Sequence, residues 1–177
     1  NGGNCDIKNL SKGSRIYFPV FVEGAKLSVG DLHFSQGDGE ITFCGGIEMP
    51  GWIDLRVNVI KNGMEKYHIK KNPAFKPGPV MPNYTDYIVF EGISVNEFSG
   101  KQTYLDANTA YRNAVLNAIE FLKTRGFTGE QAYMLLGTAP VQGTVAGIVD
   151  VPNACCTIAI PREIFKDDIV PNLEPDQ

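Results

Sequence analysis

The clearest structural signal in the chain is the stretch at residues 106–125, DANTAYRNAVLNAIEFLKTR. Its apolar side chains recur three and four positions apart, which is the spacing of one face of an α-helix. Asp106 is suited to cap the amino end, and Gly126 follows as a helix-ending glycine. The stretch therefore predicts a helix with one buried face. Its apolar positions are Tyr111, Ala114, Val115, Ala118, Ile119 and Leu122.

A second helix is predicted directly after the first. Thr128 and Gln131 have the spacing of a capping box, and helical residues continue to about Leu136. On either side of this helical pair, apolar runs predict β-strands. These runs are residues 87–95, 143–149 and 155–160.

The first sixty residues predict further strands. Residues 52–60 alternate Ile53, Leu55, Val57 and Val59 with polar residues, which indicates a strand with one buried face. Shorter candidates are residues 15–22, where Pro19 favours an edge position, and residues 40–44. Four prolines in residues 70–83 predict a surface loop. The order of strands, then helices, then strands predicts an α+β fold rather than alternating βαβ units.

Composition excludes several classes of function. Hydrophobic residues make up 43% of the 177 residues, which is enough for a core, and the net charge is −4. No stripe of Lys and Arg accumulates, so nucleic acid and anionic membranes are not expected partners. No apolar run approaches the roughly 18 residues that span a bilayer. The four cysteines match no zinc or redox spacing, and we interpret them as reduced thiols of a cytoplasmic protein. The chain starts at Asn1 without Met, so we expect the natural amino terminus to be missing.

Residues 30–40, GDLHFSQGDGE, gather chemically active side chains in a glycine-rich segment. Asp31 and His33 are two positions apart, so in an extended segment they face the same side. A carboxylate with an imidazole is a ligand set for first-row metals, commonly zinc. Glu40 could serve as a base on a metal-activated water or hold a substrate amide. A structural turn and a calcium loop are the alternatives, although the spacing does not fit an EF-hand.

Two other segments carry polar residues of interest. Residues 2–6, GGNCD, suggest a tight polar loop that includes Asp6, or else a plain turn. Glu48 lies between apolar residues, so it is either exposed on a strand or buried for a reason. The chain has no GxGxxG, no P-loop, no GxSxG and no Ser-Ser-Lys signature, which leaves metal-assisted hydrolysis or a carboxylate-centred site.

Several segments together resemble the acetamidase/formamidase family over essentially the whole chain. The proline-bearing insert and the phenylalanine after His33 resemble the formamidase branch, and the resemblance begins in the middle of such proteins. Residues 1–177 are therefore expected to be a carboxy-terminal portion. The matching segments are residues 2–6, 10–14, 19–22, 30–33, 36–40, 90–94, 147–150 and 152–154.

The resemblance implies hydrolysis of formamide, or a similar short amide, to the acid and ammonia. It implies a β-dominated α+β fold with jelly-roll-like sandwich strands and a helical pair, homo-oligomers, and a divalent metal ion, zinc by preference. Transferred residue by residue, it implies Asp6, Asp31 and His33 as metal ligands. It implies catalytic roles for Gln36, Asp38, Glu40 and Glu48, with Glu40 as general base or acid and Gln36 and Glu48 holding the amide.

The length departs from the family, whose members are about twice as long. The amino-terminal half is expected to be absent or to be a separate chain. One alternative is therefore a non-catalytic fragment, or a structural or oligomerising module of the same fold. Another is an amidase with Cys5 or Cys156 as nucleophile, although no histidine is evidently paired with either.

Overall fold

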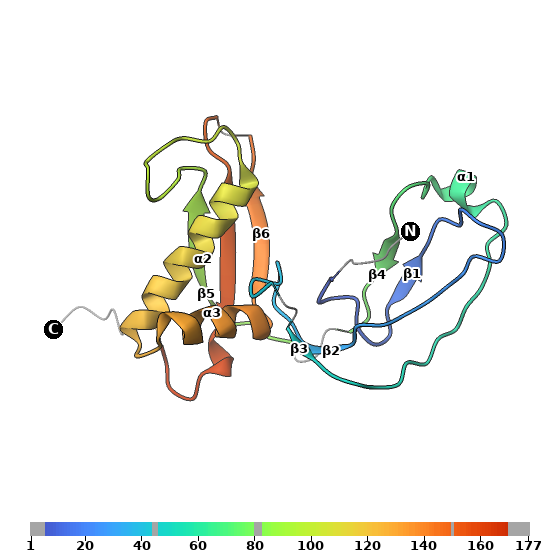
Figure 1. The fold of residues 1–177 in the computed structure, drawn as a ribbon, viewed down its shortest axis with the longest axis horizontal. Helices are drawn as coiled ribbons and strands as arrows, with labels where there is room; N and C mark the ends of the chain where they lie inside the picture. The colour runs from blue at the N-terminus through green and yellow to red at the C-terminus, as the bar shows by residue number, and fades with distance from the viewer. Residues whose placement is uncertain (1–5, 44–45, 80–82, 150, 170–177) are drawn as a thin grey trace. The chain divides into compact units, whose positions relative to one another are not determined.

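The computed structural model describes residues 6–43, 46–79, 83–149 and 151–169. The chain divides into two compact units. Unit 1 comprises Asn1–Phe34 and Glu48–Asn83, and unit 2 comprises Ser35–Ile47 and Tyr84–Gln177. Figure 1 shows the course of the chain and the labels used below.

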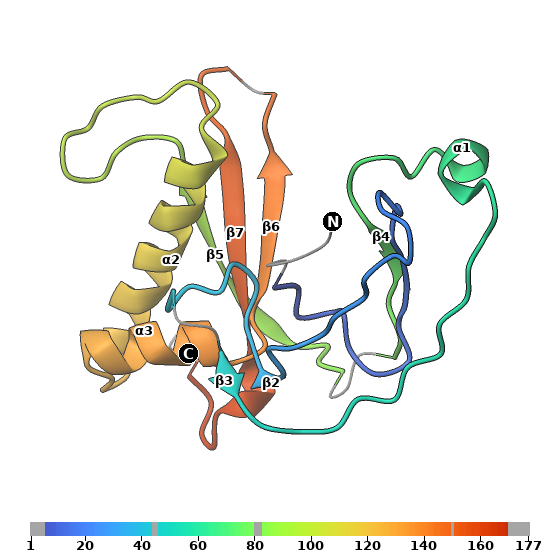
Figure 2. The same cartoon turned by 45° about the vertical axis from the view of Figure 1, so that its right-hand side comes forward.

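Unit 2 is built on an antiparallel three-stranded sheet in the order β5-β7-β6. Phe90 of β5 and Gly143 of β6 both pair with Ile158 of the central strand β7. Helix α2 lies along one face of this sheet, with α3 next to it (Figure 2). The elements are β5 (Tyr87–Ile93), α2 (Ala107–Thr124), α3 (Gly129–Thr138), β6 (Gln142–Gly147), β7 (Cys155–Pro161) and the 3-10 turn η1 (Arg162–Ile164).

The core of unit 2 lies between the helices and the sheet. Ile158 and Ile160 alternate along β7 and are fully buried, as are Leu122 of α2 and Leu136 of α3. Burial of one such side chain stabilises the fold by about 1.5–3 kcal/mol. One hydrophobic cluster joins all of these elements, which explains why the two helices and the sheet form one body. It comprises Phe90, Ala114, Val115, Ala118, Leu122, Ala132, Leu136, Val141, Ile158, Ile160 and Ile169.

Gly92 allows α2 to lie very close to β5. A Cβ atom on Gly92 would overlap the backbone of α2 at Ala110 and Ala114. Neither atom can move aside without displacing the helix, because both belong to the helix backbone. The absence of a side chain at residue 92 therefore sets the distance between helix and strand.

Two amide side chains of α2 reach the outer edge of β5. Asn113 Nδ2 donates to the carbonyl of Ile93 at 2.7 Å and to that of Val95 at 2.6 Å. Asn117 Nδ2 donates to the carbonyl of Glu91 at 3.2 Å. These bonds use backbone acceptors on the side of β5 that faces away from β7.

Unit 1 contains little regular structure. Strands β1 (Arg15–Tyr17) and β4 (Ala74–Lys76) form an antiparallel pair in which Ile16 lies opposite Phe75. A short helix, α1 (Gly63–Tyr67), follows a long extended stretch. The short strands β2 (His33–Ser35) and β3 (Ile47–Glu48) pair at the points where the chain passes between the two units.

The expected α+β class with a helical pair is confirmed. Asp106 caps α2, with its side chain accepting from the Asn108 amide, and α2 ends before Gly126. Thr128 and Gln131 form the predicted capping box of α3. The three strands predicted around the helices are present as β5, β6 and β7. Cys155 and Cys156 form no disulfide, whereas Cys5 and Cys44 lie outside the described residues.

Predictions for the first eighty residues were less accurate. The strand expected at residues 15–22 ends at Tyr17, because Pro19 lacks the amide that would continue a ladder. The strand expected at residues 40–44 is wrong for its described part, residues 40–43, which form a turn. Residues 52–60 run without a strand partner in the described chain, and the expected loop at residues 70–83 contains β4. Helix α1 was not predicted. None of the described helices has the length and apolar character needed to cross a membrane.

Candidate functional site

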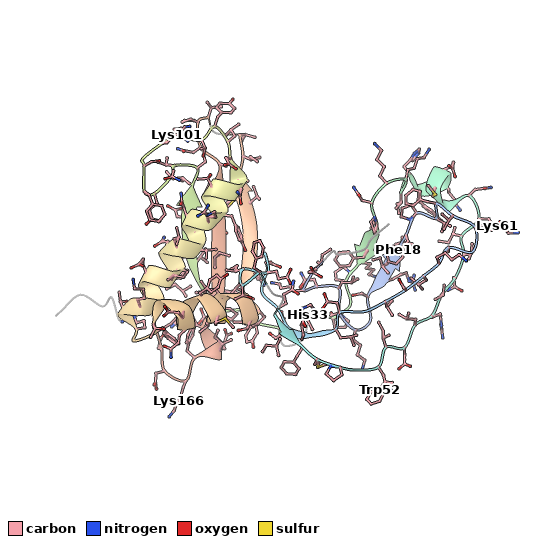
Figure 3. All side chains as sticks on the ribbon, in the orientation of Figure 1. Phe18, His33, Trp52, Lys61, Lys101 and Lys166 are labelled. Carbon is pink, nitrogen blue, oxygen red and sulfur yellow. The ribbon has the colours of Figure 1, made fainter. Side chains whose placement is uncertain are left out.

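Asp31, His33 and Glu48 come together in unit 1. One ligand atom from each residue lies within 4.8 Å of the others. His33, labelled in Figure 3, begins β2, and Glu48 ends β3. Next to them, the Met49 amide donates to the Leu32 carbonyl at 3.0 Å. This bond holds the Glu48 segment beside the Asp31–His33 segment.

The ring of His33 is oriented by its own backbone segment. Its Nδ1 lies 3.1 Å from the backbone oxygen of Asp31, which can only accept, so Nδ1 carries the proton. Its Nε2 is buried and has no hydrogen-bond partner among the described residues. A neutral imidazole with its proton on Nδ1 presents a lone pair at Nε2, and a backbone carbonyl behind the ring is a usual way of fixing a metal-binding histidine.

Two carboxylates face that lone pair. His33 Nε2 lies 3.9 Å from Asp31 Oδ1 and 3.9 Å from Glu48 Oε1. Ligands bound about 2.0–2.1 Å from one zinc ion can be at most about 4.2 Å apart, so both distances are compatible with a shared ion. The His33 side chain is 12% exposed, whereas those of Asp31 and Glu48 are 56% and 63% exposed and can adjust. The three ligand atoms lie within 4.8 Å of one another, so a small adjustment of the exposed carboxylates would let the three residues hold one divalent cation.

The backbone at Asp31 is in an uncommon conformation. Its φ of 62° lies in the left-handed region, where Asp is tolerated better than most residues. Such conformations persist where the surrounding structure requires them, and they concentrate at functional sites. The turn at Asp31 places its carbonyl on Nδ1 of His33 and its carboxylate near Nε2.

Gln36, Asp38 and Glu40 belong to unit 2. The segment that carries them is anchored through its backbone on α3 and on the residue just before β6: the Gly37 amide donates to the Gly137 carbonyl and the Asp38 amide to that of Val141. A Cβ on Gly37 would lie only 2.7 Å from the Leu136 carbonyl oxygen, so glycine permits this close approach.

Asp38 has two further hydrogen bonds within unit 2. Its Oδ2 accepts from the Gly143 amide of β6 at 2.9 Å, and its backbone oxygen accepts from the Tyr111 hydroxyl of α2 at 2.6 Å. Burial, with the nearby charge of Asp38 as the second cause, raises the pKa of Tyr111 well above its ordinary value. The Tyr111 phenol therefore stays protonated and keeps its role as donor.

The other sequence-predicted residues have the following placements. Gln36 is 7% exposed. Glu40 has a φ of 44° and accepts a backbone hydrogen bond from the Phe43 amide. Asp6 is described but does not belong to the Asp31–His33–Glu48 group. The catalytic roles expected for Gln36, Asp38 and Glu40, and the ligand role expected for Asp6, stay predictions.

Two features of these sites were not foreseen. Glu48 was expected to hold substrate, but it lies with Asp31 and His33 as a possible third ligand. Its position between apolar residues was the available sequence signal. Tyr111 was assigned to the helix core, and its hydroxyl also bonds to Asp38, 73 positions away in sequence. No local pattern in the sequence predicts that contact.

Comparison with known proteins identifies the family to which the chain belongs. The family model described as the Acetamidase/Formamidase family matches residues 1–167. The chain therefore belongs to the acetamidase/formamidase family.

Several proteins of known name are similar to the chain over most of its length. A formamidase of Methylophilus methylotrophus is 64% identical over 98% of the chain, and a putative formamidase of Schizosaccharomyces pombe is 56% identical over 97%. An acetamidase of Mycolicibacterium smegmatis is 62% identical over 82% of the chain. The solved structure of a gamma lactamase from Delftia acidovorans is 67% identical over 97% of the chain, with a TM-score of 0.94.

The match covers less than half of each of these proteins. The chain spans 42% of the Methylophilus and Schizosaccharomyces proteins, 36% of the Mycolicibacterium acetamidase and 42% of the Delftia chain. The relatives thus carry a larger part that has no counterpart in these 177 residues.

Proposed function

We propose that the chain supplies the divalent-metal site of an amide hydrolase that acts on formamide or a similar short-chain amide. The observation that carries this proposal is the buried Nε2 of His33, which has no hydrogen-bond partner among the described residues and faces two carboxylates. The names of the relatives, two of them formamidases, support the substrate class.

The ligands would be His33, Asp31 and Glu48. One imidazole with two carboxylates suits zinc, which is the ion we propose first. When bound, such an ion acidifies water and polarises an amide carbonyl, which is the chemistry that amide hydrolysis needs. The Asp31 carbonyl would hold the Nδ1 proton and so keep the Nε2 lone pair available.

The remaining predicted residues have proposed roles as well. Hydrolysis of an amide requires a proton for the departing ammonia, and we propose Glu40 for that transfer. Gln36 offers an amide that can hold the amide group of a substrate. For Asp38 we propose a positioning role, because its carboxylate and carbonyl already accept hydrogen bonds from β6 and α2.

Cellular location and assembly are part of the same proposal. Free thiols at Cys155 and Cys156 are compatible with the reducing cytoplasm. We also propose homo-oligomerisation and a role in the use of nitrogen from small amides, both as implied by the family.

Zinc content is the direct test. The purified chain is expected to bind about one equivalent of zinc, and His33→Ala is expected to abolish this binding. Asp31→Asn and Glu48→Gln should each weaken it by at least about tenfold, because even groups behind the ligands contribute about 10–100-fold. His68→Ala is the matched control, because His68 is the other histidine of the chain and is exposed. Equal zinc binding by all four variants would exclude this site.

Activity is tested on the full-length protein. Ammonia release from formamide, acetamide and propionamide should favour formamide, and both a chelator and His33→Ala should abolish it. A structural module without catalysis is the second candidate. Zinc binding without ammonia release from any of the three amides would support that second candidate.

A further inference from the structure

Residues 52–59, WIDLRVNV, form an extended segment of unit 1 whose apolar side chains face solvent. Four of them occupy alternate positions, which face the same side in an extended segment, and are called the apolar ridge here. Their exposed fractions are 51% or more, although alternation of this kind is typical of a strand with one buried face. The ridge consists of Ile53, Leu55, Val57 and Val59.

The opposite side of the segment is mainly polar. Asp54, Arg56 and Asn58 occupy the alternate positions. Trp52 precedes them with 99% of its surface exposed, and Figure 3 shows its side chain projecting from the chain. The segment therefore has one face suited to a core and one face suited to water, but within the described chain neither is covered.

The backbone of this segment also has no hydrogen-bond partner among the described residues. Between the Met49 amide, which donates to Leu32, and the Gly63 amide, which donates to Ile60, no hydrogen bond joins residues 50–59 to another described residue. A run of unpaired amides and carbonyls in extended conformation is the surface on which another strand adds. The exposed ridge and the open backbone thus point to the same kind of partner.

The relatives indicate which partner. In the Delftia lactamase, a chain with a TM-score of 0.94 to this one is embedded in a polypeptide of which it represents 42%. The same path is therefore followed within a protein whose remaining polypeptide, more than half of its length, can be placed against it. An extended segment without hydrogen bonds to the rest of the described chain needs such external contacts to compensate for the entropy lost on ordering it.

We propose that residues 52–59 are a strand-addition site for the part of the family polypeptide that lies outside the matched region. The occupant is an extended strand of that part, with apolar side chains at alternate positions and with backbone bonds to residues 52–59. A second copy of this chain is the competing occupant. Further exposed apolar residues of unit 1 favour the longer polypeptide, because a surface of that extent requires more than one added strand. They include Phe18, Val20, Phe21, Val22, Leu27 and Val29. The proposal is independent of the metal site.

Amide hydrogen exchange, measured in two samples, tests the proposed strand addition at residues 52–59. One sample is this chain alone. The other is a full-length hybrid in which this chain replaces the 174 matched residues of the Methylophilus formamidase. Amides of residues 52–59 should exchange at nearly unprotected rates in the chain alone and at least about 100-fold more slowly in the hybrid. Fast exchange in the hybrid would overturn the proposal. Protection in the chain alone that grows with its concentration would also overturn it, in favour of the second copy.

Substitutions distinguish the ridge from the rest of the segment. Leu55→Asp places a charge on the ridge, and Val57→Pro removes an amide from the ladder. Both should lower the melting temperature of the hybrid but leave that of the chain alone unchanged. Asn58→Asp is the matched control, because it adds the same charge on the polar side, and it should change neither. Equal effects of Leu55→Asp and Asn58→Asp in the hybrid would contradict the proposed orientation.

If the hybrid protein does not accumulate in cells, a second measurement tests the same proposal. The tagged chain is co-expressed with the unmatched part of the Methylophilus protein as a separate polypeptide. Co-purification that is lost with Leu55→Asp and kept with Asn58→Asp supports the site. Absence of co-purification with the unchanged chain counts against it.

Discussion

Apolar residues of the same type are buried in unit 2 and exposed in unit 1. In unit 2, Leu122 and Leu136 are fully buried between helices and sheet. In unit 1, Leu27 and Leu55 are half exposed, and the segment that contains Leu55 has no partner in the described chain. Unit 2 therefore buries its apolar side chains within itself, whereas the described residues leave many apolar side chains of unit 1 exposed.

The largest expected difference in stability between the two units comes from replacing a leucine by alanine in each of them. Leu122→Ala should lower the free energy of unfolding of the chain by about 2–5 kcal/mol, because it removes a fully buried side chain and leaves a cavity. Leu55→Ala should change it by less than about 0.5 kcal/mol. Urea unfolding followed by circular dichroism measures both. Similar losses at the two sites would show that unit 1 has a core of its own and would remove the contrast.

A smaller effect is expected where α2 meets β5. Gly92→Ala should destabilise the chain by about 1–3 kcal/mol, since the added methyl group overlaps the backbone of α2. Gly129→Ala is the comparison, because a Cβ atom there would meet nothing within 4 Å and the residue begins α3. This variant should be neutral or slightly stabilising in thermal unfolding. A neutral Gly92→Ala would mean that α2 can move away from the sheet at no cost.

The smallest effect concerns the cap of α2. Hydrogen bonds, first that from the Thr109 hydroxyl, lower the pKa of Asp106 below its ordinary value. The charged form is therefore favoured by folding, and its contribution is present above the unfolded-state pKa and disappears as pH falls through the folded-state pKa. Asp106→Asn should reduce stability at about pH 6, and the difference from the unchanged chain should vanish towards about pH 2.5. Unfolding at a series of pH values measures it, and a difference that persists at the acid end of the series would contradict the assignment.

Sequence patterns predicted unit 2 better than unit 1 for a physical reason. The Asp106 cap, the Thr128 capping box and the alternation in β7 are local signals, and local contacts satisfy them. The strand pattern of residues 52–60 is equally clear, but a ladder needs a partner that the described chain does not provide. Alternation of apolar and polar residues indicates that a segment can pair as a strand, but it does not show whether a partner strand is present.

The candidate site was likewise predictable from local sequence only in part. Asp31 and His33 could be predicted because they are two positions apart in an extended segment. Their grouping with Glu48 depends on the pairing of β2 with β3, which lie twelve positions apart in sequence from Ser35 to Ile47, and no spacing rule predicts that pairing. The contact between Tyr111 and Asp38 similarly depends on how α2 packs.

The hydrogen bonds at the margins of the three-stranded sheet control where this protein can associate through its backbone. Asn113 and Asn117 occupy carbonyls along the free side of β5, and Asp38 occupies the Gly143 amide on β6. A foreign strand that approaches either margin must first displace these groups, which protects the sheet against uncontrolled stacking of one molecule on another. Within the described part of the chain, residues 52–59 have no hydrogen bonds of this kind, so the proposed strand can add there without displacing any group.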